Sequence, residues 1–203
     1  MARKYIAIAG NMGAGKSSLV EFLCRHFDLK PFFEPNDVNP FLADFYRNMK
    51  RFAFHSQMYF LAHKFRIHRE LDCYPETVVQ DRSIYEDAEI FALNLFKQGF
   101  LSKEEYRTYR DLYEVMVEAI KPPDLLIYLE CPLRTLKKRI AERGRAIERD
   151  VPDEYLKRLE RYYRRWMERY DRSPVLTIST ERMDYMEDFI HRQDLLERIA
   201  KYL

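Results

Sequence analysis

Residues 10–17 read Gly10-Asn11-Met12-Gly13-Ala14-Gly15-Lys16-Ser17, which completes the pattern G-x-x-x-x-G-K-[ST]. The apolar run Tyr5 to Ala9 precedes this octet, and a helix-like stretch, Ser18 to Phe27, follows it. A strand, a glycine-rich turn and a helix in this order are the setting of a phosphate-binding loop. Three of the chain's five glycines fall in the octet, so the backbone can turn tightly there and point successive N–H groups at a polyphosphate.

The residues at the end of the loop predict which ligands it holds. Lys16 is expected to reach the β- and γ-phosphates of a triphosphate such as ATP, and the hydroxyl of Ser17 is expected to bind Mg²⁺. The helix that begins here, with Ser18 in its first turn, adds the positive end of its dipole. We therefore predict a nucleoside triphosphate and Mg²⁺ at residues 10–18, and the alternative is a merely glycine-rich turn.

The composition bounds the class of protein. The chain has 203 residues, 47% of them hydrophobic, so we expect a single domain over residues 1–203. Its 35 basic and 33 acidic residues nearly cancel to a net charge of +2, which does not favour nucleic acid or an anionic membrane surface as a partner. Cys24, Cys73 and Cys131 form no C-x-x-C pair, which favours reduced thiols in the cytoplasm. No run of about 18 uncharged apolar residues is present, so we expect no membrane span and no targeting segment.

Apolar runs that alternate with helical stretches predict the fold. The runs typical of buried strands are Lys4 to Ala9, Thr77 to Gln80, Leu125 to Glu130 and Val175 to Ile178, with a weaker one at Pro31 to Glu34. The helical stretches are Gly15 to Phe27, Pro40 to Asn48, Phe52 to Asp72, Tyr85 to Lys97, Lys103 to Lys121, Pro132 to Glu142, Asp153 to Tyr170 and Tyr185 to Leu203. This alternation predicts a three-layer α/β fold, in which a central parallel sheet of about five strands is flanked by helices and ligands bind at the carboxyl ends of the strands.

Charged side chains follow two of these strands at that same edge. Glu34 ends the weak strand, and because Pro35 prevents a helix from continuing, its carboxylate is expected to project and act as a general base. Asp81 ends a buried strand and is a candidate to hold Mg²⁺ directly or through water. Arg82 follows it and is expected to neutralise charge on a transferring phosphoryl group. The alternatives are a solvated loop carboxylate for Glu34 and a strand-end ion pair for Asp81 and Arg82.

A cluster of arginines predicts a lid. Arg139, Arg143, Arg145 and Arg149 surround Gly144, and the first two lie one helical turn apart. A basic helix end beside a glycine is typical of a mobile segment that closes over phosphates, so we predict a lid at about residues 139–150. The alternative is a solvated surface on which Glu142 and Glu148 neutralise the arginines.

The stretch from Arg158 to Trp166 interleaves cations and aromatic side chains, as nucleic-acid-binding segments do. Helical spacing places Leu159, Tyr162, Tyr163 and Trp166 on one face, with the arginines outside. We interpret this segment as a core-facing helix and expect no nucleic-acid partner.

With these parts in this order, the chain resembles the deoxynucleoside kinase family, especially its small bacterial deoxyadenosine/deoxyguanosine kinase branch. The segments that carry the resemblance are Glu34-Pro35-Asn36-Asp37-Val38-Asn39-Pro40-Phe41, Phe45-Tyr46, Gln57 and Asp81-Arg82-Ser83-Ile84-Tyr85-Glu86-Asp87. The resemblance spans nearly the whole chain. It implies a P-loop kinase fold, a cytoplasmic homodimer, and transfer of the γ-phosphoryl group of ATP, or of another triphosphate, to the 5′-hydroxyl of a deoxynucleoside in nucleoside salvage.

The resemblance also implies substrate contacts. Glu34 would take a proton from the 5′-hydroxyl, and Tyr46 and Glu148 would hold the 3′-hydroxyl. Gln57 and Asp87 would read the edge of the base. A carboxylate acceptor favours bases with an amino group over thymine, so deoxyadenosine or deoxyguanosine, and also deoxycytidine, are the expected substrates.

Further positions follow from the same likeness. Lys64 stands close to the place of an arginine that often pairs with an acid such as Asp87, which makes it a substrate-binding candidate. Arg139, Arg143 and Arg145 would be the lid arginines that contact the triphosphate, the first two with a catalytic role beside Lys16 and Arg82. Residues 179–185 would lie near the adenine of the donor.

The sequence is also compatible with two other functions. A nucleoside monophosphate kinase of the thymidylate kinase kind shares the loop and the lid, but Glu34 would repel the phosphate of its acceptor. A nucleotide-dependent switch without enzymatic activity is the other alternative. The N-K-x-D and D-x-x-G motifs of GTP-dependent switches are missing from the sequence.

Overall fold

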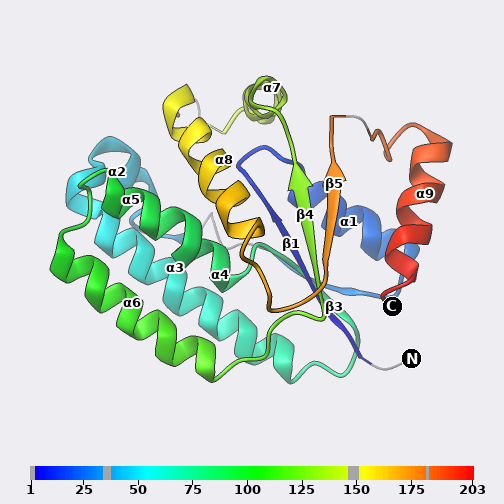
Figure 1. Cartoon of the computed structure of the whole chain (residues 1–203), viewed down its shortest axis with the longest axis horizontal. Helices are drawn as coiled ribbons and strands as arrows, with labels where there is room; N and C mark the ends of the chain where they lie inside the picture. The colour runs from blue at the N-terminus through cyan, green and yellow to red at the C-terminus, as the bar shows by residue number, and fades with distance from the viewer. Residues whose placement is uncertain (1–2, 34–37, 146–150, 182) are drawn as a thin grey trace.

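The computed structural model describes residues 3–33, 38–145, 151–181 and 183–203, and its central element is a parallel sheet. The strands of this sheet are β1 (Tyr5–Gly10), β2 (Lys30–Phe32), β3 (Val78–Asp81), β4 (Leu125–Glu130) and β5 (Val175–Ser179). They are arranged in the order β2-β3-β1-β4-β5, and each neighbouring pair is parallel. The predicted α/β fold with a five-stranded parallel sheet is confirmed (Figure 1).

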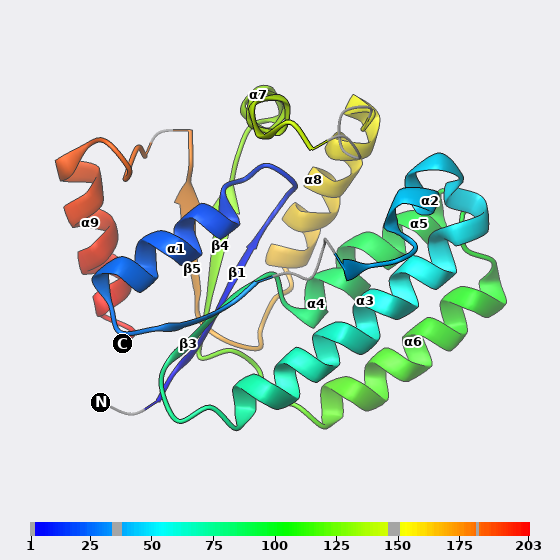
Figure 2. The same ribbon diagram turned by 180° about the vertical axis from the view of Figure 1, so that it is seen from behind.

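Helices cover both faces of the sheet (Figures 1 and 2). One face carries α1 (Lys16–His26) and α9 (Phe189–Ala200). The other carries α3 (Met49–Asp72), α6 (Lys103–Glu118) and α8 (Asp153–Met167). The short helix α2 (Leu42–Arg47) packs on α3, and α7 (Leu133–Arg143) lies beyond the carboxyl end of β4. None of the helices that the structure describes is both long and apolar enough to cross a lipid bilayer.

The two layers of core follow from the alternation of side chains along the strands. Ile6 and Ile8 of β1 pack into the cluster that contains Leu19 of α1 and Leu195 of α9. Ala7, from the same strand, packs into the cluster on the opposite face. Successive residues of a strand point to opposite faces, so a strand that is covered on both sides must be apolar throughout. This is why the strands could be recognised as unbroken apolar runs.

One predicted helix is wrong in its internal structure. The stretch from Tyr85 to Lys97 was expected to be a single α-helix, whereas the structure has α4 (Ile84–Glu86), a π-helix η2 (Asp87–Ala92) and α5 (Leu93–Lys97). A π-helix inserts an extra residue per turn, is rare, and occurs most often at functional sites. Side-chain periodicity does not reveal it, because the apolar spacing on either side remains helical.

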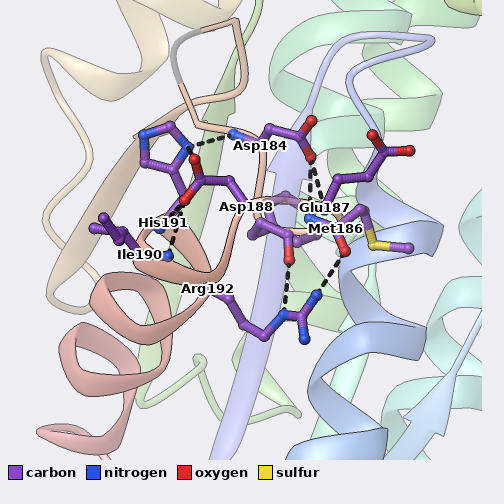
Figure 3. Close-up of polar contacts among 8 residues, drawn as sticks. Asp184, Met186, Glu187, Asp188, Ile190, His191 and Arg192 are labelled. Carbon is purple, nitrogen blue, oxygen red and sulfur yellow. Dashed lines mark hydrogen bonds and ion pairs between the residues drawn. The ribbon is translucent and has the colours of Figure 1, made fainter.

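Helix ends are decided by local caps, some of which differ from the prediction. Ser102 accepts a hydrogen bond from the N–H of Glu105 at 3.1 Å, and Glu105 accepts one from the N–H of Ser102 at 2.8 Å, which confirms the predicted capping box of α6. Helix α9 begins at Phe189 rather than at Tyr185, because Asp188 accepts hydrogen bonds from the N–H groups of Ile190 and His191 (Figure 3). Before it, Asp184 accepts from the N–H groups of Met186 and Glu187, which holds a turn in place of a helix.

The helix expected to face the core does so. Leu159, Tyr163 and Trp166 of α8 are buried, and Tyr162 packs partly buried against the same cluster. The aromatic side chains of this stretch therefore serve the core.

Candidate active site

The phosphate loop joins β1 to α1 in a tight turn that depends on glycine. Gly13 and Gly15 have φ angles of +78° and +95°, in the left-handed region that favours glycine. Helix α1 begins at Lys16, whose side chain is mostly buried and donates a hydrogen bond from Nζ to the carbonyl oxygen of Asn11 at 3.2 Å. The ammonium group is thus folded back over the loop, where phosphate oxygens would be bound.

A large cavity opens on one side of the loop. It has a volume of about 670 Å³ and is lined by Gly13, Gly15, Lys16, Ser17, Ser18, Thr135, Arg139, Glu142, Arg143, Arg145, Thr180, Glu181, Met183, Asp184, Tyr185 and Met186. The predicted arginines of α7 and the segment after β5 therefore line the same cavity as the loop. The guanidinium of Arg139 donates hydrogen bonds to the carbonyl oxygens of Ala14 and Thr180, which ties α7 to the loop and to that segment. We call this space the donor cavity.

A second, smaller cavity lies on the other side of the loop. Its lining contains Met12, Gly13, Lys16, Ser17, Leu42, Phe45, Tyr46, Ser56, Gln57, Phe60, Asp81, Arg82, Asp87, Phe91, Arg143, Arg145 and Tyr155. These residues come from the loop, α2, α3, the end of β3, η2, the end of α7 and α8. Most of the residues that the family resemblance assigns to the substrate therefore face one space, which we call the acceptor cavity.

The two cavities meet at the phosphate loop. Five residues line both of them: Gly13, Lys16, Ser17, Arg143 and Arg145. All three ionisable members of this set are cations. A group that passes from one cavity to the other would do so among these positive charges, which suits the transfer of an anion.

Ser17 and Asp81 form a pair suited to Mg²⁺. The hydroxyl of Ser17 donates a hydrogen bond to Oδ2 of Asp81 at 2.5 Å. Asp81 is 4% exposed, and its Oδ1 is buried without a hydrogen-bond partner among the described residues. A buried carboxylate oxygen left without a donor, next to a hydroxyl at a phosphate loop, is the kind of oxygen donor set that Mg²⁺ prefers. The residues therefore fit the predicted ion.

Arg82 is held in an unusual backbone conformation. Among the described residues other than glycine, Arg82 alone has a positive φ, which is +61°. Its N–H donates to the carbonyl oxygen of Ile8 at 3.0 Å, and its Nη2 donates to that of Gly10 at 3.3 Å. The guanidinium also lies over the ring of Phe91, 4.4 Å from the centroid. Left-handed conformations cost free energy and persist at sites where the surroundings enforce them, so this turn aims the guanidinium along the loop.

Lys64, an expected substrate contact, is not among the residues that line the acceptor cavity. Its side chain is fully buried, and Nζ donates a hydrogen bond to the carbonyl oxygen of Arg82 at 2.6 Å. The side chain lies behind the strained turn, because α3 directs it to the backbone of Arg82.

Other predicted residues differ in where they lie. Glu34 and Glu148 fall outside the described residues, so the structure does not place the predicted base or the second contact to the 3′-hydroxyl. Gly10, Asn11 and Ala14 line neither cavity, and Met12 lines the acceptor cavity. Asn11 instead donates a hydrogen bond from Nδ2 to the carbonyl oxygen of Leu156 in α8 at 3.1 Å.

The sequence reasoning assigned no site role to several lining residues. Phe91, Phe45 and Tyr155 supply apolar and aromatic surface to the acceptor cavity. Phe91 lies four residues after Asp87 in η2, and Phe45 immediately precedes Tyr46, so their proximity to predicted site residues was a usable signal. Tyr155 carried no such signal, because only the return of α8 across the loop brings it to the cavity.

The fold and the paired cavities define a nucleotide-dependent phosphotransferase of the P-loop class. Comparison with known proteins narrows the class. Residues 6–203 match the family model described as deoxynucleoside kinase. The chain is 40% identical over 207 residues to a deoxyguanosine kinase of Lactobacillus johnsonii, and 36% identical over 200 residues to a deoxyadenosine/deoxycytidine kinase of Bacillus subtilis. Each of these alignments covers 98% of this chain and 92% of the relative.

Solved structures agree with this assignment. A deoxyadenosine kinase from M. mycoides with bound dATP superposes with a TM-score of 0.85 at 26% identity, covering 98% of this chain and 100% of the other. The same enzyme with dCMP and dCDP as products gives a TM-score of 0.86 at 27% identity with the same coverage. The chain therefore belongs to the deoxynucleoside kinase family, and it is a phosphotransferase that acts on a hydroxyl group of a deoxynucleoside.

Proposed function

We propose that this enzyme transfers the γ-phosphoryl group of ATP, or of a related triphosphate, to the 5′-hydroxyl of deoxyadenosine or deoxyguanosine, and also of deoxycytidine. The reaction would serve nucleoside salvage. The observation that carries this proposal is the set of five residues shared by the donor and acceptor cavities. A triphosphate in the first cavity and a nucleoside in the second would meet at Lys16, Arg143 and Arg145.

The proposed chemistry divides among residues of the two cavities. Glu34, outside the described residues, would accept the proton of the 5′-hydroxyl. Phosphoryl transfer passes through a loose transition state, so orientation of this hydroxyl matters more than strong proton abstraction. Lys16 and Arg82 would stabilise the charge on the equatorial oxygens of the transferring group, with Arg139 and Arg143 contributing from α7.

Mg²⁺ would be held by Ser17 and Asp81. When bound, it neutralises charge on the β- and γ-phosphates of the donor. Asp81 would offer the ion its buried Oδ1, which has no hydrogen-bond partner among the described residues. Ser17, the last residue of the loop, would offer its hydroxyl oxygen.

The preference for bases with an amino group follows from the acceptor cavity. Gln57 is 5% exposed, and its Oε1 is buried without a hydrogen-bond partner among the described residues. A buried amide oxygen costs free energy unless a donor meets it, and an amino or ring N–H group of a base is such a donor. The carboxylate of Asp87, 4% exposed, lines the same cavity. Relatives described as kinases of deoxyadenosine, deoxycytidine and deoxyguanosine all act on bases that carry an amino group.

A panel of four deoxynucleosides tests the function. With ATP and Mg²⁺, we expect turnover of deoxyadenosine and deoxyguanosine, weaker turnover of deoxycytidine, and little of thymidine. The corresponding monophosphates should not be phosphorylated. Turnover of monophosphates but not of nucleosides would contradict the proposal and favour a nucleoside monophosphate kinase.

The role of Glu34 has its own test. Glu34→Gln keeps the size of the side chain but cannot accept the proton, so kcat should fall by about 10²-fold or more, with the melting temperature unchanged. Glu76→Gln, an acid in the loop before β3, is the control and should retain activity. Near-normal turnover of the Glu34 variant would show that another group is the base.

We further propose that the protein works as a cytoplasmic homodimer. The buried and half-buried aromatic side chains of α3 and of residues 84–97 give this side of the molecule a large apolar content. Equilibrium sedimentation should give twice the chain mass of 24.8 kDa at micromolar concentration. A single species of 24.8 kDa would refute the dimer without affecting the proposed reaction.

A further inference from the structure

Glu86 is a buried carboxylate directly behind the phosphate loop. Its side chain is fully buried, and it lines neither the donor nor the acceptor cavity. Burial raises the pKa of Glu86, and the positive charges of Arg82, Lys16 and Lys64 act in the opposite direction. A carboxylate taken out of water is costly unless cations and hydrogen bonds compensate it, and here two of those cations belong to the proposed transfer machinery.

Three hydrogen bonds reach this one carboxylate. Oε1 accepts from the N–H of Gly10 at 3.2 Å and from the hydroxyl of Tyr163 at 2.8 Å. Oε2 accepts from the N–H of Ser83 at 3.1 Å. The donors lie on three segments that are far apart in the sequence: Gly10 is 76 positions before Glu86, and Tyr163 is 77 positions after it.

Each of these segments positions a part of the site. Gly10 is the first residue of the phosphate loop, and Ser83 directly follows the left-handed Arg82. Tyr163 belongs to α8, the helix that follows the lid segment and that contributes Tyr155 to the acceptor cavity. The carboxylate therefore joins the loop that would hold the donor, the turn that carries Arg82, and the helix beyond the lid.

We propose that Glu86 is a positioning residue for phosphoryl transfer, which sets the phosphate loop and the Arg82 turn in register through its hydrogen bonds to Gly10, Ser83 and Tyr163. The inference rests on the proposed kinase function. A side chain with only a packing role could be apolar here at lower cost, because the position is fully buried and the desolvation cost of the acid would disappear. The carboxylate instead accepts three hydrogen bonds, two at Oε1 and one at Oε2. Each donor lies on a segment that carries part of the site.

Glu86→Gln is the direct test. The amide has one acceptor oxygen in place of two, so at least one of the three donors faces an NH₂ group and the register is disturbed. We expect kcat with deoxyadenosine to fall by about 10- to 100-fold, because small displacements of catalytic groups carry costs of this size. KM for ATP and for the nucleoside should each stay within about threefold, since the groups that contact the two substrates remain. This split between kcat and KM is not expected of a residue that only stabilises the fold.

A pair of hydroxyl deletions tests the same idea without removing a charge. Tyr163→Phe removes the donor to Oε1. Tyr128→Phe is the matched control, because the Tyr128 ring stacks on that of Tyr163, with centroids 5.9 Å apart, and the described chain gives it no hydrogen bond to Glu86. We expect kcat of Tyr163→Phe to be about three- to tenfold below that of Tyr128→Phe at similar melting temperature.

The outcomes separate cleanly. A folded Glu86→Gln variant with kcat within about threefold of the wild type overturns the proposal. If that variant does not fold, equal kcat values for Tyr163→Phe and Tyr128→Phe overturn it instead. A wild-type protein that phosphorylates no deoxynucleoside contradicts the proposed function, whereas an active wild type with an equally active Glu86→Gln variant contradicts only the role of Glu86.

Discussion

At the scale of single residues, the acceptor cavity is unusual for how deeply its polar side chains are buried. Asp81, Arg82 and Asp87 are each 4% exposed, and Gln57 is 5% exposed. Charged side chains are seldom buried to this extent unless they have partners, because water solvates them far better than protein does. These four side chains give the acceptor cavity a polar lining that is largely withdrawn from water.

Asp87 gives the first prediction at this scale. Asp87→Asn replaces an acceptor by an amide that can also donate to a base carbonyl, such as those of thymine. We expect the ratio of kcat/KM for deoxyadenosine to that for thymidine to fall about tenfold or more, while transfer itself persists. Competition assays with the two nucleosides measure this ratio directly.

Glu89→Gln is the matched control for this substitution. Glu89 lies in the same π-helix but pairs with Arg110 at 2.8 Å and lines neither cavity. Its base ranking should equal that of the wild type. If Asp87→Asn also leaves the ranking unchanged, Asp87 does not read the base.

At the scale of elements, the contact between the phosphate loop and α7 decides how α7 is anchored. A Cβ atom added to Gly13 would lie 2.9 Å from Cγ1 of Ile140 and 2.9 Å from the carbonyl oxygen of Leu136. The absence of a side chain at this position thus allows α7 to pack directly on the loop. Arg139 adds a hydrogen bond from α7 to the loop at Ala14.

This contact predicts the effect of Gly13→Ala. The methyl group must push α7 away from the loop, which displaces Arg139 and Arg143 relative to Lys16. We expect KM for ATP to rise about tenfold or more, since misplaced binding groups lose much of their effect. The measurement is ATP-dependent turnover at saturating nucleoside.

Gly99→Ala separates this steric effect from backbone strain. Gly99 has a φ of +73°, close to that of Gly13, but a Cβ added there meets no atom of the described chain within 4 Å. Because alanine disfavours a positive φ, backbone strain should cost both variants about 1 kcal/mol of stability, to which the contact with α7 adds in Gly13→Ala. Only Gly13→Ala should change KM for ATP, and a normal KM in that variant would mean that α7 adjusts without consequence.

At the scale of the whole molecule, a buried histidine couples folding to pH. His68 of α3 is fully buried, with its ring 5.5 Å from that of Tyr5, centroid to centroid. Burial, aided by the positive charge of Lys64, lowers the pKa of His68 from 6.5 to about 3. The folded protein therefore keeps this ring neutral across the physiological range.

The sign of the pH dependence follows from this shift. Between pH 6.5 and 3 the unfolded chain binds a proton at His68 that the folded protein does not bind, so the free energy of unfolding falls as the pH falls. The slope is about 1.4 kcal/mol per pH unit, which amounts to about 2 kcal/mol at pH 5. Urea unfolding at pH 7 and pH 5 should show this loss in the wild type and a smaller one in His68→Gln. Equal losses in both proteins would contradict the assignment to His68.

Much of the fold could be predicted from local patterns. The five strands were recognised because a parallel strand covered on both faces is an unbroken apolar run, and the capping box at Ser102 marked the start of α6. The start of α9 was predicted too early, because the turn held by Asp184 resembles helical sequence until its hydrogen bonds are known. The π-helix at residues 87–92 was missed for a similar reason, since one extra residue in a turn leaves the apolar spacing around it intact.

By itself, the sequence determined the phosphate loop, the position of Asp81 at the carboxyl end of a buried strand, and the α/β class. Each of these depends on residues within a few positions of one another. The tertiary structure alone decided that Lys64 supports the backbone of Arg82, that Tyr155 faces the acceptor cavity, and that Glu86 joins three segments. These contacts depend on how distant segments pack, as in the hydrogen bond from Asn11 to Leu156, 145 residues away. Periodicity and motifs describe short-range order, whereas the burial of a polar side chain is set by neighbours that only the folded chain brings together.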